Sequence, residues 1–125
     1  MDTKAKILIV EDEQTLLNAL AEKFIQEGFE VFKAIDGEDG LRQAQEQIPA
    51  MILLDIILPK LDGLGMLEKL KGTEATSKIP VILLTNLSDQ ESISRGVELG
   101  ANGYLVKADI SLDEVVGKVK SLLNI

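Results

Sequence analysis

The chain has 125 residues, of which 46% are hydrophobic and 27% are charged, and its formal net charge at pH 7 is −8. This length fits one domain, which we expect to span residues 1–125, and the acidic balance argues against nucleic acid as a direct partner. The absence of cysteine and histidine excludes thiol catalysis, disulfides and histidine-based chemistry within the chain. Because neither a membrane-spanning run nor a signal peptide is evident, we expect a cytoplasmic protein without membrane association.

Apolar runs alternate with stretches of helical periodicity from end to end. Strands are expected at 7–10, 30–35, 51–55, 81–84 and 102–107. Helices are expected at 15–25, 38–47 and 63–71, from a capping box at 88–91 to Gly100, and onward from a capping box at 111–114. Asp62 is placed to cap the third helix. The alternation predicts five βα units.

Most of these strand runs are continuously apolar, which is typical of strands buried on both faces of a parallel sheet. The run at 30–35 alternates only weakly with polar residues and is therefore expected at an edge. Helices must then cover both faces, with right-handed crossovers between the strands. The predicted fold is an α/β, three-layer, doubly wound sandwich. Ligands of such folds bind outside the carboxyl ends of the strands.

Polar residues stand where the buried runs stop. Glu11 and Asp12 follow the first run, Asp55 ends the third, Thr85 follows the fourth and Lys107 follows the fifth. Two carboxylates about 4 Å apart repel by roughly 4 kcal/mol at an effective dielectric near 20, so a cluster of them requires a cation. Mg²⁺ suits such a site because it binds through one or two carboxylates, waters and phosphate oxygens. This edge therefore fits a divalent metal and a phosphoryl group.

Each of these residues also has an ordinary explanation. Glu11 or Asp12 could cap the first helix, Asp55 could be a loop carboxylate, Thr85 suits a strand by propensity, and Lys107 could be a surface lysine. It is their joint occurrence at four strand ends that favours a functional site.

Four motifs together resemble the receiver domain of bacterial response regulators, the phosphoacceptor part of two-component signalling. They are Ile-Leu-Ile-Val-Glu-Asp-Glu at 7–13, Leu-Leu-Asp-Ile-Ile-Leu-Pro-Lys-Leu-Asp-Gly at 53–63, Leu-Thr at 84–85 and Gly-Ala-Asn-Gly-Tyr-Leu-Val-Lys at 100–107. The resemblance extends from about residue 6 to 123. It implies a flavodoxin-like fold, with a five-stranded parallel sheet of order 2-1-3-4-5 and five helices.

The resemblance also implies roles for the strand-end residues. Asp55 would accept the phosphoryl group and become an aspartyl phosphate, and Lys107 would pair with the phosphoryl oxygens. Glu11 and Asp12 would hold Mg²⁺ together with Asp55 and the backbone carbonyl of Ile57. Phosphoryl transfer depends on positioning and charge neutralisation, which a site without histidine can supply.

Further residues would contact the phosphoryl group or transmit its arrival. The backbones of Asn86 and Ile57 would contact it, Thr85 would move toward it, and Tyr104 would turn inward as the switch aromatic. The altered surface would lie on the fourth helix, fifth strand and fifth helix, and it would include Arg95, Glu98, Tyr104 and Asp109.

The implied partners follow from these roles. The donor would be a histidine kinase or a histidine phosphotransfer protein, and the output would be an effector protein or a phosphorylation-dependent homodimer. Such a domain is a signalling switch without a turnover substrate, able at most to lose its own phosphoryl group slowly.

Three departures from the family pattern carry expectations of their own. Ala108 follows Lys107 where proline is usual, so that peptide is expected to be trans, or else strained. Asn86 occupies a position where a small residue is usual. Ile57 and Leu87 are aliphatic at positions that admit the hydrolytic water, which predicts a long-lived phosphoryl group.

Other functions fit less well. A haloacid-dehalogenase-type phosphatase requires a second acid two residues after its nucleophile, where this chain has Ile57. An FMN module requires a Ser/Thr/Gly-rich loop after the first strand, where this chain has three acidic residues, 11–13. The remaining alternative is a receiver-fold interaction module that phosphorylation does not regulate.

Overall fold

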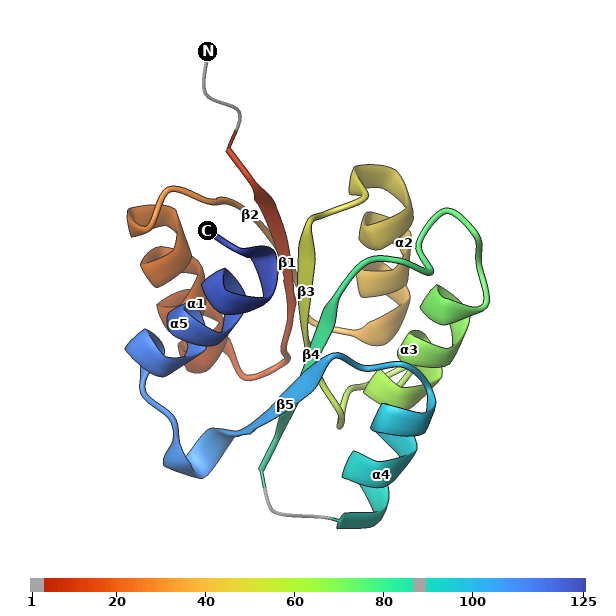
Figure 1. Cartoon of the computed structure of the whole chain (residues 1–125). Coiled ribbons are helices and arrows are strands. Elements are labelled where there is room, and N and C mark those ends of the chain that lie inside the picture. Colours follow the sequence, from red (N-terminus) through yellow and green to blue (C-terminus); the bar gives the residue numbers. More distant parts are fainter. Residues whose placement is uncertain (1–3, 87–89) are drawn as a thin grey trace.

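The computed structural model describes residues 4–86 and 90–125, which form a five-stranded parallel sheet between two layers of helices (Figure 1). The strands are β1 (Lys6–Val10), β2 (Glu30–Ala34), β3 (Met51–Asp55), β4 (Val81–Thr85) and β5 (Gly103–Val106). The helices are α1 (Gln14–Gln26), α2 (Gly37–Gln47), α3 (Gly63–Lys71), α4 (Gln90–Glu98) and α5 (Leu112–Leu123), with a short 3₁₀ turn at Lys107–Asp109. The strand order is β2-β1-β3-β4-β5, which confirms the predicted doubly wound fold.

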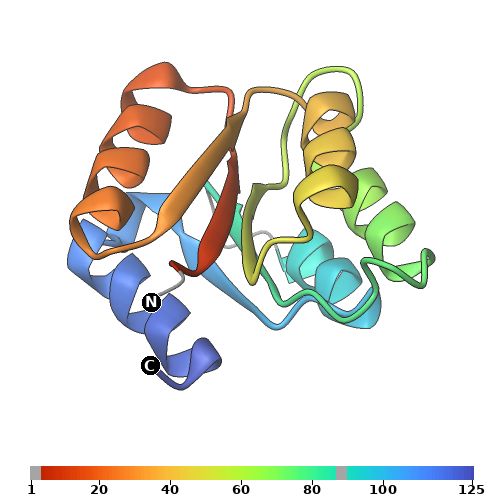
Figure 2. The ribbon, with the colours of Figure 1, turned by 90° about the horizontal axis from the view of Figure 1, so that it is seen from above.

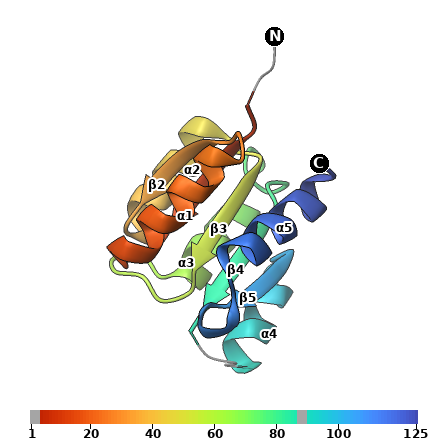
Figure 3. The same cartoon turned by 90° about the vertical axis from the view of Figure 1, so that its left-hand side faces the viewer.

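Helices α1 and α5 cover one face of the sheet, and α2, α3 and α4 cover the other (Figure 2). Figure 3 looks onto the α1 and α5 face. Alternate side chains of each strand point to opposite faces, so every buried strand contributes to both cores. In β1, Ile7 and Ile9 pack toward α1 and α5, whereas Leu8 and Val10 pack toward α2 and α3. This double burial explains why the strand runs are continuously apolar.

The strand β2 lies at an edge of the sheet, as its weaker pattern predicted. Its residues Glu30 and Lys33 are exposed, and Val31 and Phe32 are only half-buried. The interior strands β3 and β4 are buried throughout. The alternating pattern of β2 therefore reflects its position beside β1 alone.

Caps fix the starts of three helices. Asp62 accepts a hydrogen bond from the Gly65 N–H at 2.8 Å, and Ser111 forms a full capping box with Glu114. Asp36 caps α2 through the Asp39 N–H at 2.8 Å, so that this helix begins at Gly37, one residue before the predicted start. The capping box expected at 88–91 lies partly outside the described residues.

Two expectations at the carboxyl end of β5 are refined. The strand ends at Val106, so Lys107 belongs to the 3₁₀ turn and not to the strand. Throughout the described segments every peptide bond is trans, including the bond between Lys107 and Ala108.

Within those same segments no helix combines the length and the apolar character that crossing a bilayer requires.

Candidate functional site

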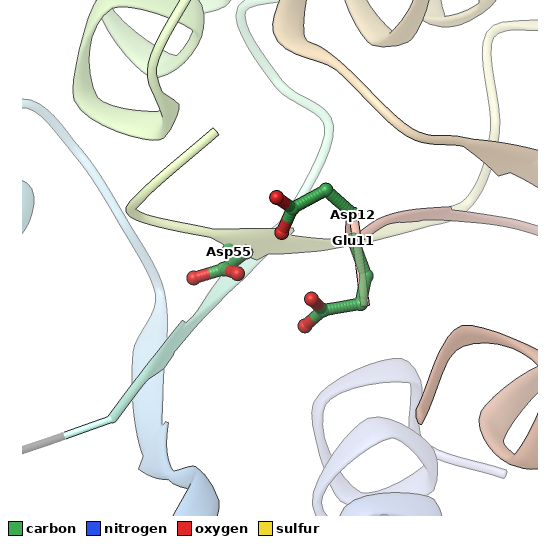
Figure 4. A group of neighbouring side chains, drawn as sticks. All are labelled: Glu11, Asp12 and Asp55. Carbon is green, nitrogen blue, oxygen red and sulfur yellow. The ribbon is translucent and has the colours of Figure 1, made fainter. Parts of the chain in front are cut away.

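The carboxyl ends of β1 and β3 bring three acidic side chains together. Glu11 and Asp12 follow β1, and Asp55 is the last residue of β3 (Figure 4). One oxygen of each carboxylate lies within 4.8 Å of one oxygen of the others. Parallel pairing produces this cluster. Val10 is in register with Leu54, so Glu11, which follows Val10, lies beside Asp55, which follows Leu54. Glu11 and Asp55 are buried, whereas Asp12 is exposed.

Lys107 reaches this cluster from the far edge of the sheet. Its Nζ donates a hydrogen bond to Asp55 Oδ2 at 2.8 Å and lies 2.6 Å from Glu11 Oε1. The lysine side chain is only 10% exposed. Burial disfavours its charged form, but the carboxylates of Asp55 and Glu11 outweigh this effect, so the pKa of Lys107 is raised. The ammonium therefore stays charged and serves as the fixed counter-ion of the cluster.

Glu11 is wholly buried, and each of its two carboxylate oxygens has one partner. Its Oε2 accepts a hydrogen bond from the Glu13 N–H at 2.9 Å, and its Oε1 lies 2.6 Å from the Lys107 ammonium. Burial raises the pKa of Glu11, against the opposing effect of Lys107. The ordinary explanation as a helix cap does not hold for α1, because its N-cap is Glu13, which makes no side-chain cap bond. The Lys107 ammonium thus neutralises the buried Oε1 of Glu11 while no metal is present.

Backbone groups fix the Asp55 carboxylate from the other side. Its Oδ1 accepts a hydrogen bond from the Ile57 N–H at 3.2 Å. The Ile56 N–H donates to the Leu84 carbonyl at 3.1 Å, and the Gly63 N–H donates to the Ile56 carbonyl at 2.8 Å. The Ile57 side chain itself is 70% exposed. The carboxylate is therefore held by the start of the loop that follows β3.

The remaining predicted residues lie around the cluster at different depths. Thr85 is buried at the end of β4, and Asn86 after it is exposed. Tyr104, in β5, is 44% exposed and lies three residues before Lys107. The structure thus brings four of the predicted residues into one cluster, Glu11, Asp12, Asp55 and Lys107, and leaves Tyr104 at the surface. Leu87 lies outside the described residues.

Sequence analysis missed several contributors to the site. An open groove of about 390 Å³ beside Lys107 and Asn86 is lined also by Leu16 and Ala19 of α1, whose periodicity indicated only an ordinary helix. Close backbone contacts of Gly37 and Gly63 with the loop after β3 were also not predicted. Of these two glycines, only Gly63 could have been singled out from the sequence, because it directly follows the capping residue Asp62.

Comparisons with known proteins agree with this geometry. The model of the family described as "Response regulator receiver domain" matches residues 7–120. The transcriptional regulatory protein PrrA of Mycobacterium tuberculosis is 38% identical over 122 residues, covering 98% of this chain and 51% of PrrA. The alkaline phosphatase synthesis transcriptional regulatory protein PhoP of Bacillus subtilis is 36% identical over 119 residues, covering 95% of this chain and 48% of PhoP. The chain spans about half the length of the curated relatives it matches.

Solved structures show the same fold across their length. A CheY-like response regulator receiver domain protein from Methanospirillum hungatei has a TM-score of 0.91 at 26% identity, covering 98% of this chain and 95% of that one. The receiver domain of the sensor histidine kinase PA1611 from Pseudomonas aeruginosa, which has a magnesium ion coordinated in its active site cleft, has a TM-score of 0.89 at 26% identity, covering 98% and 100%. On the family match and these likenesses, the chain belongs to the response regulator receiver domains.

Proposed function

We propose that Asp55 accepts a phosphoryl group from a histidine of a partner protein, in a Mg²⁺-dependent reaction that switches a protein-binding surface. The observation that carries this proposal is the pairing of a buried Asp55 with Lys107 inside a cluster of carboxylates. A structural ion pair would need one carboxylate for one ammonium. Here a single lysine faces Asp55 and Glu11, with Asp12 close by, which leaves unbalanced negative charge for a metal.

The donor set fits Mg²⁺, which prefers hard oxygen ligands and retains several waters. Glu11, Asp12 and Asp55 would hold the ion together with the backbone carbonyl of Ile57. The three neighbouring carboxylates, which a single ammonium does not balance, support this assignment. The bound ion would supply charge neutralisation for the carboxylates and for the incoming phosphoryl oxygens.

The residues of the chain would carry out the transfer as follows. One oxygen of the Asp55 carboxylate attacks the phosphorus in line with the P–N bond of a phosphohistidine. The P–O bond forms as the P–N bond breaks, and the electron pair of the P–N bond stays with the imidazole of the partner. Lys107 donates to the transferred phosphoryl oxygens, as do Thr85 and the backbone of Asn86. The donor histidine belongs to a histidine kinase or a phosphotransfer protein, because this chain has none.

The charge at Asp55 would then alter a distant surface. Thr85 moves toward the phosphoryl group and Tyr104 follows it inward, which changes the face of α4, β5 and α5 that an effector or a second copy binds. Arg95 in α4 and Asp109 after β5 are both exposed. An aliphatic residue at position 57, whose backbone contacts Asp55, would disfavour the entry of hydrolytic water and so favour a long-lived aspartyl phosphate. The domain then acts in the cytoplasm as a switch with no turnover substrate.

Beryllofluoride tests this proposal, because BeF₃⁻ on a carboxylate imitates the phosphoryl group. Amide NMR spectra of the whole chain are recorded with BeF₃⁻, with and without Mg²⁺. We expect Mg²⁺-dependent shifts at Asp55, Thr85 and Lys107 that extend to Tyr104. The matched control is Asp55→Asn, which keeps the shape of the side chain and removes the attacking oxygen.

Two outcomes would count against the proposal. If BeF₃⁻ and Mg²⁺ produce no change, the chain is better described as an interaction module that phosphorylation does not regulate. If the shifts stay within the site, the pocket binds the phosphoryl mimic, but the proposed coupling from the site to the surface at Tyr104 is refuted.

A further inference from the structure

The loop between β3 and α3, residues 56–62, carries the Ile57 carbonyl that the proposed function assigns to Mg²⁺. The N–H of the same residue holds Asp55 Oδ1 at 3.2 Å, so the loop and the carboxylate are positioned together. The side chain of Ile57 is 70% exposed and cannot fix the loop by packing. The Ile57 carbonyl is therefore placed by the loop backbone, which Ile56 anchors at its start through bonds to Leu84 and Gly63 and which contacts α2 farther along.

The far part of this loop rests on the first residue of α2. A Cβ at Gly37 would lie 1.7 Å from the Leu61 carbonyl oxygen and 2.6 Å from the Leu61 carbonyl carbon. The Gly37 N–H also points to the Pro59 carbonyl at 3.4 Å. Non-bonded heavy atoms meet at about 3.5 Å, so any side chain at residue 37 must displace either the loop or the helix by roughly 1 Å or more.

Of these two elements, the loop yields more easily. Helix α2 is seated by Gly40, whose Cβ position lies 3.0 Å from side-chain atoms of the buried residues Val10 and Met66. In the loop, by contrast, Pro59 and Lys60 are exposed. A side chain at residue 37 is therefore expected to push residues 59–61 outward while α2 stays in place.

The loop also has an uncommon backbone conformation next to this contact. Lys60 has φ = 68°, in the left-handed region that residues with a side chain adopt rarely. The turn is closed by the Leu61 N–H, which donates to the Pro59 carbonyl at 2.8 Å. Lys60 Nζ also lies 3.7 Å from Asp36 Oδ2, beside Gly37. Residues 59–61 are thus held in one position against α2.

We propose that Gly37 is a positioning residue for the metal site: its missing side chain lets residues 59–61 seat against α2, and this seating sets the Ile57 carbonyl. The inference rests on the proposed function, because it concerns the affinity for Mg²⁺. It gives Gly37 a role at a site that its own atoms do not reach. Groups that orient metal ligands typically change affinity by about 10–100-fold when they are altered.

The first test compares Gly37→Ala with Gly117→Ala in the whole chain. Both variants add one methyl group to a helix, but the methyl group at Gly37 meets the loop, whereas the methyl group at Gly117 in α5 meets nothing within 4 Å beyond its own helix backbone. The dissociation constant for Mg²⁺ is measured by calorimetry, and metal-free melting is measured beside it. We expect about a tenfold weaker binding of Mg²⁺ for Gly37→Ala, together with amide shifts at Ile57 and Asp55. Gly117→Ala should bind Mg²⁺ as the unaltered chain does.

A second pair of variants tests the same idea without touching α2. Lys60→Val and Lys60→Gly both remove the ammonium that faces Asp36, but only glycine adopts a positive φ readily. We expect Lys60→Val to weaken Mg²⁺ binding several-fold relative to Lys60→Gly. Because residue 60 is exposed, both variants should fold even if Gly37→Ala does not.

The outcomes separate this inference from the proposed function. If the unaltered chain binds no Mg²⁺, the metal site is wrong and the inference is overturned with it. If the unaltered chain binds Mg²⁺ but each variant binds it as its control does, the role of Gly37 alone is refuted. Weaker binding in Gly37→Ala and Lys60→Val, each against its control, establishes the role.

Discussion

At the scale of single residues, Lys107 decides whether the cluster of carboxylates can exist without a metal. Its ammonium lies within 2.8 Å of oxygens of both Asp55 and Glu11, and all three side chains are almost completely buried. Two buried carboxylates without this cation would repel each other in an environment that solvates them poorly. Asp12 differs from them, because its side chain is exposed. Within the described residues it also forms no ion pair with a lysine or an arginine.

This difference makes Asp12→Ala an informative substitution. Without metal, removing one charge of a repelling group should slightly stabilise the protein, by less than about 1 kcal/mol because the residue is exposed. With metal, the stabilisation that Mg²⁺ provides should disappear, since one of its ligands is lost. Thermal melts with and without Mg²⁺ measure both effects. A strongly destabilised variant that still responds to Mg²⁺ would refute the role of Asp12.

At the scale of elements, α1 and α5 are joined by a chain of ion pairs. Lys120 Nζ lies 2.7 Å from Glu27 Oε1, Lys23 Nζ lies 2.9 Å from Asp113 Oδ1, and Lys23 also lies 3.7 Å from Glu27. The hydrogen bond from Lys120 holds the pKa of Glu27 below its usual range, with a smaller contribution from Lys23. These pairs link the C-terminal part of α1 to both the first and the last turn of α5, on the same face of the sheet.

The lowered pKa of Glu27 predicts a pH dependence of the contact between the helices. A carboxylate whose pKa is lower in the folded state stabilises the fold above its unfolded pKa, and this contribution is lost as the pH falls through the folded pKa. Glu27→Gln should therefore lower the melting temperature near neutral pH, and the difference should shrink at acidic pH. Melts between pH 7 and pH 3 measure this. Glu22→Gln, on the exposed side of α1, is the control. A difference that is constant with pH would contradict the prediction.

How far the sequence predicts the structure depends on the range of the interactions. The strands were predictable because burial on both faces leaves a local mark, and the cap at Asp62 because it acts within three residues. The contact of Gly37 with Leu61 and the contact of Lys107 with Asp55 join distant parts of the chain, so no local pattern indicated their geometry. The 3₁₀ turn that begins at Lys107 was not predicted, because the apolar run before it is typical of a strand and the strand was therefore extended to residue 107.

At the scale of the whole molecule, the site and the proposed output surface share β5. Lys107 follows this strand at the site, while Tyr104 lies within it and is 44% exposed. The chain contains one tyrosine and no tryptophan, so its tyrosine fluorescence reports on Tyr104 alone. A single intrinsic probe therefore stands on the surface that the switch would change.

Quenching by acrylamide can follow the switch directly. When BeF₃⁻ and Mg²⁺ are added together, Tyr104 should turn inward and its fluorescence should be quenched less. Thr85→Ala should bind BeF₃⁻ but lose this protection, because the step between site and surface is removed. Asp55→Asn should show no response to BeF₃⁻. Unchanged quenching in the unaltered chain, despite BeF₃⁻ binding at the site, would refute the inward movement of Tyr104.

The arrangement of three carboxylates around one ammonium also has a consequence for charge balance. Glu11, Asp12 and Asp55 with Lys107 carry a sum of two negative charges when all are ionised, which one divalent cation would cancel. An aspartyl phosphate adds roughly one negative charge to the free carboxylate. The cation would therefore prepare a neutral site for the phosphoryl group, and the phosphoryl group would in turn attract the cation more strongly. By thermodynamic linkage, each of the two would raise the affinity for the other by the same factor.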